Sequence, residues 1–319
     1  MLKVAVTDFT FPSLDIEEAI LRPSGCDIVS GQCRTPESLI PLVADADAVI
    51  TQFAPMNADV IGRLSKARVI VRYGIGYDNV DCDAARARRI PVCNVPGFCI
   101  DEVADHTLAF ILAATRNLGA NCAHMTQGNW GLGVPIKKMR TLGDQTVGII
   151  GLGRIGRAVA DRLRAFKTQL LAFDPVVSAD EAAAHGCSLV GLDQLLAESD
   201  IVTLHCPSNQ NTHGLMDRRT LAKMKENSIL INVGRGDLVD LGALIEALES
   251  GRLAAASLDV FDPEPLPRDS PLLKMDNVLV SAHIASVSPK AQRILRETVA
   301  GIALAALLGE SVPNVVNGV

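Results

Sequence analysis

The sequence lacks both long apolar runs and long blocks of like charge. Its apolar tracts, such as Ile302–Leu308, are far shorter than the roughly 20 residues that a membrane-spanning helix requires. No block of five or six like charges occurs, and the formal net charge of the 319 residues is −6. A nucleic-acid-binding surface shows clustered positive charge instead. We therefore expect a protein that binds neither membrane nor nucleic acid.

Metal-binding cysteine patterns are also missing. The eight cysteines are scattered along the chain, with no Cys-x-x-Cys pair and no tight His/Cys cluster. The spacing therefore argues against a structural zinc site, and we expect no bound metal. The chain begins Met1-Leu2-Lys3-Val4, without the pattern of a secretory signal peptide. We expect reduced thiols and a cytoplasmic location.

The first hundred residues alternate short apolar strands with helical segments. Strands are expected at 3–7, 27–30, 48–50, 69–72 and 92–95, and helices at 14–21, 36–44, 58–64 and 83–89. Such alternation predicts a parallel sheet with helices on its faces. A length of 319 residues suggests about two domains.

A dinucleotide-binding signature lies near the middle of the chain. An apolar strand at 146–150 precedes Gly151, Gly153 and Gly156, which have the G-x-G-x-x-G spacing, and an amphipathic helical stretch follows. Gly151 permits a tight turn, Gly153 lets the backbone approach a pyrophosphate, and Gly156 lets helix and strand pack closely. Free N–H groups at the helix start, where Arg154 and Ile155 lie, then face the anion.

An acidic residue in the right place favours NAD over NADP. A second strand, at 169–173, ends at Asp174, which comes 18 residues after Gly156. A carboxylate there suits the adenosine ribose hydroxyls and repels a 2′-phosphate. Four further strands are expected at 200–205, 228–233, 254–260 and 277–281, making six, with helices at 192–197, 221–225 and 241–250. This half of the chain therefore reads as a doubly wound Rossmann domain.

Three side chains at the ends of these later strands have chemistry suited to catalysis. Arg235 follows the fourth expected strand between two glycines, and a guanidinium there could hold a carbonyl and a carboxylate oxygen. Glu264 lies between two prolines, and His283 follows the sixth expected strand. Histidine is the usual proton donor and acceptor near neutral pH. Taken singly, each also has a structural interpretation: Arg235 as a surface arginine, Glu264 as a loop acid and His283 as a hydrogen-bonded core histidine.

A glycine pair also follows the expected strand at 69–72. Gly74, Ile75 and Gly76 form a loop whose backbone N–H groups could bind a carboxylate, although a plain turn explains the segment as well. A long helix is expected from about residue 101 to 117. His106 lies within it and reads as a packed or hydrogen-bonded residue rather than a catalyst.

Several of these segments together resemble the D-2-hydroxyacid dehydrogenase family. That family includes phosphoglycerate dehydrogenases, hydroxypyruvate and glyoxylate reductases, and the C-terminal-binding-protein corepressors. The resemblance covers nearly the whole chain and is carried, in the family's order, by residues 72–79, 94–97, 103–107, 151–156, 205–207, 232–236, 259–265 and 283–285.

The resemblance implies an α/β fold of two doubly wound parallel-sheet domains with the active-site cleft between them. A flavodoxin-like substrate-binding domain would comprise residues 1–99 and 290–319, and a Rossmann NAD-binding domain residues 100–289. Most relatives are homodimers, built largely through the segment near 100–145.

Roles for individual residues follow from the same resemblance. His283 would be the acid/base, Glu264 its carboxylate partner, and Arg235 the residue that orients the substrate and polarises its carbonyl. The Gly74–Gly76 loop would bind the substrate carboxylate, and Asp259 the nicotinamide carboxamide. Further NAD contacts are implied at His205, Cys206, Pro207, Thr212, Val233, Gly234 and Ala285.

The implied activity is NAD-dependent transfer of a hydride to or from C2 of a small 2-keto or 2-hydroxy acid. Phosphoglycerate dehydrogenases usually carry an arginine where this chain reads Thr51-Gln52-Phe53-Ala54-Pro55, so a non-phosphorylated substrate is expected. A phosphoglycerate dehydrogenase remains an alternative. An NAD(H)-sensing binding protein of the corepressor type is a second alternative, because residues 52–55, 91–96 and 205–207 look most like that branch.

Overall fold

Parallel β-strands form the core of both units into which the chain divides. The computed structural model describes all 319 residues. One unit comprises Met1–Phe98 and Ser288–Val319, and the other comprises Cys99–Val287. Each is described by itself below.

The first unit contains a five-stranded parallel sheet with the order β2-β1-β3-β4-β5, which is the flavodoxin-like order. Its strands are β1 (Leu2–Val6), β2 (Cys26–Ser30), β3 (Ala48–Thr51), β4 (Ile70–Arg72) and β5 (Val92–Cys93). Its helices are α1 (Asp15–Leu21), α2 (Pro36–Val43), α3 (Ala58–Gly62), α4 (Cys82–Ala87) and α12 (Pro289–Leu308). Every residue of β3 and β4 is buried, as expected for strands covered by helices on both faces.

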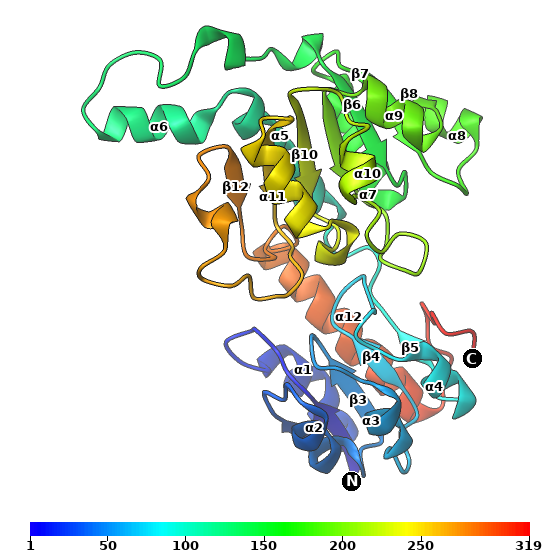
Figure 1. Cartoon of the computed structure of the whole chain (residues 1–319). Helices are drawn as coiled ribbons and strands as arrows, with labels where there is room; N and C mark the ends of the chain where they lie inside the picture. Colours follow the sequence, from blue (N-terminus) through cyan, green and yellow to red (C-terminus); the bar gives the residue numbers. More distant parts are fainter. The chain divides into compact units, whose positions relative to one another are not determined.

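Helix α12, the last of the chain, packs against α1, the first (Figure 1). A buried group of charges joins the two helices. Arg296 of α12 donates hydrogen bonds to both carboxylate oxygens of Glu17 in α1 and to Asp15. The Glu17 and Arg296 side chains are 0% and 5% exposed, so this ion pair is buried. Tyr73, which directly precedes Gly74, donates its hydroxyl to the same Glu17 carboxylate at 2.8 Å. The network thereby connects α12 to the loop after β4.

The second unit contains a seven-stranded parallel sheet with the order β12-β11-β10-β9-β6-β7-β8. Its strands are β6 (Thr146–Ile150), β7 (Gln169–Phe173), β8 (Cys187–Leu189), β9 (Ile201–Leu204), β10 (Ser228–Asn232), β11 (Leu253–Leu258) and β12 (Val278–Val280). Its helices are α5 (Ile100–Thr115), α6 (Leu118–Thr126), α7 (Arg154–Arg164), α8 (Ala179–Ala184), α9 (Leu192–Glu198), α10 (Arg218–Leu221) and α11 (Leu241–Glu249). When the strands of this sheet are numbered from β6, the run from β8 to β11 has the order 3-2-1-4-5-6, which is the Rossmann topology. Strand β12 extends the sheet beside β11.

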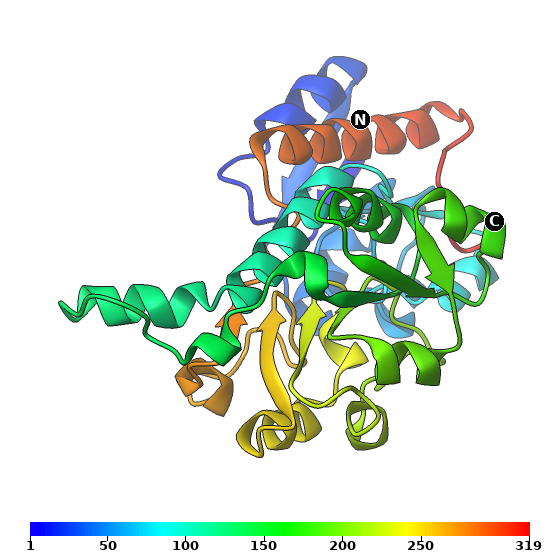
Figure 2. The same ribbon diagram turned by 90° about the horizontal axis from the view of Figure 1, so that it is seen from above.

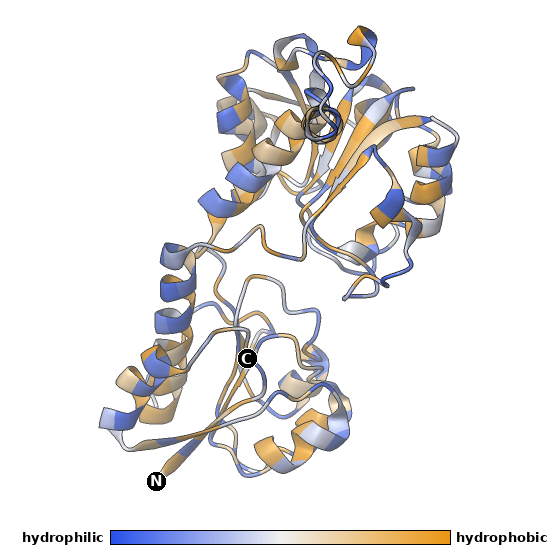
Figure 3. Cartoon of the chain, turned by 90° about the vertical axis from the view of Figure 1, so that its left-hand side faces the viewer, coloured by the Kyte–Doolittle hydropathy of each residue, from blue (hydrophilic) through white to orange (hydrophobic).

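The apolar strands of this sheet make the core of the second unit, and Figure 3 shows them coloured mainly as hydrophobic. A cluster of buried side chains, including Ile150, Val202, Leu204, Leu230 and Leu258, fills one face of the sheet. Helix α5 packs against α7 and β11. Helix α6 has no buried residue and, with the loop after it, extends away from the sheet (Figures 1 and 2). No helix of the structure has the length and hydropathy that crossing a bilayer would require.

The structure confirms the α/β fold with two parallel sheets and corrects some of its elements. The second sheet has seven strands rather than six, because the short edge strand β8 was missed. Arg235 and His283 therefore follow the fifth and seventh strands of that sheet. The helix expected at 221–225 was wrong. Helix α10 spans Arg218–Leu221 instead, because the Asp217 side chain caps its start by accepting from the Thr220 N–H.

The strand expected at 92–95 is also shorter than predicted, since only Val92–Cys93 belong to β5. The two residues that follow bond to the loop after β4 instead. The Asn94 side chain donates to the Ile75 carbonyl at 2.6 Å, and the Val95 N–H donates to the Gly74 carbonyl at 2.9 Å.

The buried ion pair of the first unit gives a stability prediction. Replacing Arg296 by leucine leaves the Glu17 carboxylate buried without its cation. Breaking a buried pair in this way costs about 3–5 kcal/mol, so we expect the free energy of unfolding in urea to fall by about that amount. Arg293→Leu is the matched control, because Arg293 lies on the same helix and pairs with Glu297 while 73% exposed. Because an exposed ion pair adds little to stability, Arg293→Leu should unfold at nearly the wild-type urea concentration, and equal destabilisation of the two variants would contradict the buried-pair account.

Candidate active site

The glycine-rich turn after β6 has the geometry that a pyrophosphate requires. Gly151 has a φ of 92°, and a Cβ there would lie 2.5 Å from the backbone N of Cys206. A Cβ on Gly156 would lie 2.1 Å from the Gly151 carbonyl oxygen, so helix α7 can approach the turn only with glycine at this position. Gly153, by contrast, is exposed, and a Cβ there would meet no atom within 4 Å.

The start of α7 is open on the same side. Gly153 is its N-cap and supplies no side-chain cap, and Arg154 and Ile155 are the first residues of the helix. The first backbone N–H groups of a helix have no partner within it and favour an anion. These residues fit the pyrophosphate of a dinucleotide.

Asp174 lies at the carboxyl end of β7, beside that turn. Its Oδ2 accepts from the Leu152 N–H at 2.8 Å, and its Oδ1 accepts from the Val176 N–H at 3.0 Å. The carboxylate thus helps to hold the glycine-rich turn.

The loop after β9 carries four of the expected cofactor contacts: His205, Cys206, Pro207 and Thr212. Burial of the ring lowers the pKa of His205 to about 3, although part of the residue stays accessible, so the imidazole is neutral. Burial raises the pKa of Cys206 to about 11, and its thiol is therefore protonated. Thr212 Oγ1 donates to the Pro207 carbonyl at 2.6 Å and fixes the bend of the loop. None of these groups is placed to exchange protons near neutral pH.

The loop after β10 presents Arg235 between Gly234 and Gly236. Asn232, the last residue of β10, accepts from the Gly234 N–H at 3.0 Å and donates to the Arg235 carbonyl at 2.8 Å. The adjoining Val233 is 8% exposed, and Ser208 Oγ ties this loop to the one after β9 by donating to Asp237. The position of Arg235 is therefore set by backbone and side-chain hydrogen bonds on both sides.

Gly236 brings two loops into direct contact. A Cβ on Gly236 would lie 1.9 Å from the backbone carbonyl carbon of Phe261, so only glycine permits this approach. Phe261 begins the turn that carries Glu264, and its N–H donates to Glu264 Oε1 at 3.0 Å. The contact therefore fixes the arginine loop against the loop of the carboxylate.

Glu264 and His283 form the expected pair. His283 Nδ1 lies 2.9 Å from Glu264 Oε2, and the two side chains are 28% and 33% exposed. Burial raises the pKa of Glu264, but the hydrogen bond and charge of His283, the Phe261 N–H and Arg235 outweigh it and hold the pKa below its usual value. The Glu264 carboxylate is therefore ionised near neutral pH and accepts the hydrogen bond from His283 Nδ1.

Asp259 holds the turn on which His283 lies. Its carboxylate is 1% exposed and accepts from the N–H groups of Ile284 and Ala285, at 2.9 and 2.8 Å, and from the Ser281 hydroxyl. Its carbonyl accepts from the His283 N–H at 2.7 Å. His283 has a φ of 53°, in the left-handed region. Holding a non-glycine residue there costs of order 1–3 kcal/mol and requires fixed surroundings, which these hydrogen bonds supply.

In the first unit, the loop Gly74–Gly76 follows β4. Gly74 has a φ of 144°, and a Cβ there would lie 1.5 Å from Arg72 Nη1, so a guanidinium lies directly against the glycine. Asn94 fixes the Ile75 carbonyl, as described above. The loop is therefore ordered by its own neighbours rather than being a loose turn.

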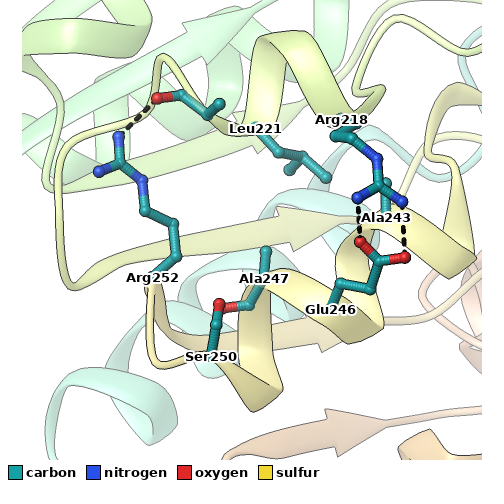
Figure 4. Close-up of a pocket in the computed structure, with 8 residues that line it drawn as sticks. Arg218, Leu221, Ala243, Glu246, Ala247, Ser250 and Arg252 are labelled. Atoms are coloured by element: carbon teal, nitrogen blue, oxygen red, sulfur yellow. Dashed lines mark hydrogen bonds and ion pairs between the residues drawn. The ribbon is translucent and has the colours of Figure 1, made fainter.

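Within the second unit the structure thus gathers Arg235, Glu264 and His283 around the ends of β10, β11 and β12. The surface pocket in Figure 4 lies elsewhere, between α10 and α11, with a volume of about 420 Å³. Its two arginines are engaged, Arg218 with Glu246 and Arg252 with the Ala222 carbonyl, and it contains no candidate residue. No cluster of His, Cys, Asp or Glu suited to a metal ion occurs, and all eight cysteines are free.

Sequence reasoning missed two residues that organise this site, Asn232 and Ser281. Asn232 could have been found, because a polar residue at the end of an otherwise apolar strand needs a local partner. Ser281 gave no comparable signal, since its partners lie far away in the sequence.

The chain is similar to known proteins over most of its length. Residues 108–285, more than half of the chain, match the family model described as D-isomer specific 2-hydroxyacid dehydrogenase, NAD binding domain. A glyoxylate reductase from Korarchaeum cryptofilum is 38% identical over 284 residues, which are 88% of this chain and 85% of that protein. A D-3-phosphoglycerate dehydrogenase from Mycobacterium tuberculosis is 40% identical over 286 residues, 88% of this chain and 53% of that protein. The chain spans about half the length of the phosphoglycerate dehydrogenases of this kind.

Solved structures show the same fold. The crystal structure of a D-lactate dehydrogenase from Aquifex aeolicus, complexed with NAD and lactic acid, has a TM-score of 0.88 and 26% identity. The match covers 96% of each chain. The matched family model is an NAD-binding domain, and the glycine-rich turn and Asp174 fit that cofactor, so NAD is the cofactor of the second unit. The chain belongs to the D-isomer specific 2-hydroxyacid dehydrogenase family.

Proposed function

We propose that this protein is an NAD-dependent D-2-hydroxyacid dehydrogenase that interconverts a small 2-keto acid and its D-2-hydroxy acid. The observation that carries the proposal is the hydrogen bond of 2.9 Å between His283 and Glu264, beside Arg235 and in the unit that carries the dinucleotide-binding turn. A protein that only senses NAD(H) has no need of a hydrogen-bonded acid/base pair near an arginine.

The cofactor would be held by the glycine-rich turn, Asp174 and the loop after β9. We propose that Gly151, Gly153, Arg154, Ile155 and Gly156 bind the pyrophosphate and that Asp174 binds the adenosine ribose. The remaining proposed contacts with the cofactor are His205, Cys206, Pro207, Thr212, Val233, Gly234, Asp259 and Ala285. When bound, NADH supplies the hydride that reduces C2 of the keto acid.

The chain's own residues supply the proton and the orientation. Glu264 holds His283 through Nδ1, so we assign the other ring nitrogen, Nε2, as the donor of a proton to the carbonyl oxygen. Arg235 is positively charged and suited to binding the carbonyl and carboxylate oxygens together, which stabilises charge that develops on the oxygen during reduction. In the oxidation direction, neutral His283 would accept the proton from the hydroxyl group.

From the first unit, we propose that Gly74, Ile75 and Gly76 bind the substrate carboxylate through backbone N–H groups. The guanidinium of Arg72 against Gly74 adds positive charge there. Phe53, 38% exposed, lies in the loop after β3 where phosphoglycerate dehydrogenases usually carry an arginine, which favours a non-phosphorylated substrate. A homodimer and a cytoplasmic location are further proposals, and light scattering of the purified chain tests the first.

Turnover of 2-keto acids tests the function directly. Purified protein should oxidise NADH with at least one of glyoxylate, hydroxypyruvate, pyruvate, phosphohydroxypyruvate and bulkier 2-keto acids, followed at 340 nm. His283→Ala should lower kcat about 10²–10⁴-fold, since the general acid is lost, while NADH binding measured by fluorescence stays nearly unchanged. Tight NADH binding without turnover of any substrate would favour the sensor instead. Wild-type turnover by His283→Ala would show that His283 is not the general acid.

Glu264→Ala tests the acid/base pair. The variant removes the carboxylate that holds His283 through Nδ1, so kcat for reduction should fall by about tenfold or more because the general acid is no longer oriented. Glu249→Ala, an exposed acid at the end of α11, is the control and should keep the wild-type kcat. Unchanged kcat in Glu264→Ala would exclude the pairing.

Asp174→Ala tests cofactor choice. Removing the carboxylate removes its repulsion of a 2′-phosphate, so the ratio of kcat/KM for NADPH to that for NADH should rise about tenfold or more. Asp180→Ala, an exposed acid on α8, should leave the ratio unchanged. Unaltered preference in Asp174→Ala would mean that another residue selects NAD.

A further inference from the structure

A short chain of hydrogen bonds lies behind the Asp259 carboxylate and ends on helix α5. Ser281, just after β12, donates its hydroxyl to Asp259 Oδ1. His106 Nε2 lies 3.1 Å from Ser281 Oγ and 3.9 Å from Asp259 Oδ1. None of the proposed chemical steps uses His106 or Ser281.

The Asp259 carboxylate at one end decides which atom donates each of these hydrogen bonds. An ionised carboxylate only accepts, so the single hydroxyl hydrogen of Ser281 is committed to Asp259. Ser281 Oγ can then interact with His106 only as an acceptor, and His106 must carry its hydrogen on Nε2. The hydrogen bonds therefore run from the His106 N–H through the Ser281 O–H to Asp259.

His106 is suited to anchor this chain because its own position is fixed. The side chain is 22% exposed, and its ring packs edge-on against Phe110, with centroids 4.5 Å apart. Helix α5, which carries both rings, packs against β11, the strand that ends directly before Asp259. The anchor and the carboxylate thus belong to elements in direct contact.

At the other end, this series of hydrogen bonds reaches the backbone of the turn that carries His283. Asp259 Oδ1, the oxygen that accepts from Ser281, also accepts from the Ile284 N–H at 2.9 Å. Without a donor to its Oγ, the Ser281 hydroxyl is free to rotate away from Asp259, and the carboxylate loses one of the contacts that fix its orientation. The turn that keeps His283 at a positive φ depends on that orientation.

We propose that His106 is a positioning residue which, through Ser281 and Asp259, holds the His283 turn in its reactive conformation. This inference rests on the proposed dehydrogenase function for its catalytic consequence. Its structural part, the coupling of His106 to His283, does not depend on turnover.

The test compares three variants of the 319-residue chain. His106→Leu removes the N–H donor. His106→Gln keeps a side-chain N–H at a similar reach. Thr107→Val is the control for disturbance of α5, because Thr107 Oγ1 bonds only to the Val103 carbonyl of its own helix. Steady-state kinetics give kcat and KM, and NMR spectra of protein labelled with ¹⁵N-histidine report the imidazoles. The His283 signals are assigned by their absence from His283→Ala.

We expect kcat of His106→Leu to fall about tenfold or more, as for other lost supporting hydrogen bonds, with KM values little changed. His106→Gln should recover most of that loss, and Thr107→Val should match the wild type. The His283 signals should shift in His106→Leu and stay in place in Thr107→Val, and His106 should show the Nε2–H tautomer.

Unchanged kcat in His106→Leu, equal impairment of the leucine and glutamine variants, or unmoved His283 signals would each overturn the proposal. A wild-type protein that reduces no 2-keto acid contradicts the proposed function instead. The His283 spectra would still decide the positioning role in that case.

Discussion

The buried carboxylate of Asp259 is the constraint on which the candidate active site depends. It lies directly after β11 and accepts two consecutive backbone N–H groups, from Ile284 and Ala285, together with the Ser281 hydroxyl. These contacts fold the chain after β12 back towards the end of β11 and hold His283 in a left-handed conformation. That backbone directs the imidazole to Glu264. A mobile turn would let His283 relax out of the left-handed region and lose the hydrogen bond.

The parallel sheet explains why so many groups meet at one edge. Every strand of the second sheet runs in the same direction, so the residues that follow β6, β7, β9, β10, β11 and β12 all lie at the same side. Close backbone contacts then set the spacing between loops, because glycine at 151 and 236 allows one loop to touch the next. The cofactor turn, the arginine loop and the histidine turn are thereby held by a single rigid scaffold.

Much of this arrangement was predictable from the sequence, because it depends on local patterns. Apolar strands followed by glycine turns located β6 and the start of α7, and charged residues after strands identified Arg235 and His283. Strand β8 was missed because it has three residues and buries only one, Cys187. Helix α6 was missed because it buries no residue and therefore shows no apolar face.

What could not be predicted depends on contacts between distant segments. The positive φ of His283 follows from hydrogen bonds to Asp259, and the role of Ser281 follows from His106, which lies 175 residues away in the sequence. No spacing rule relates these positions. The resemblance to the family assigned Asp259 to the cofactor, whereas the structure also shows it as the acceptor that orders the turn.

The central claim is that this site transfers a hydride to one face of a 2-keto acid and yields the D isomer. The most direct measurement is reduction of a prochiral 2-keto acid with NADH that carries deuterium at both C4 positions, followed by chiral chromatography and mass spectrometry. The account predicts a single product, the D-2-hydroxy acid, with the deuterium on C2. An L or racemic product, or a product without deuterium at C2, would contradict it.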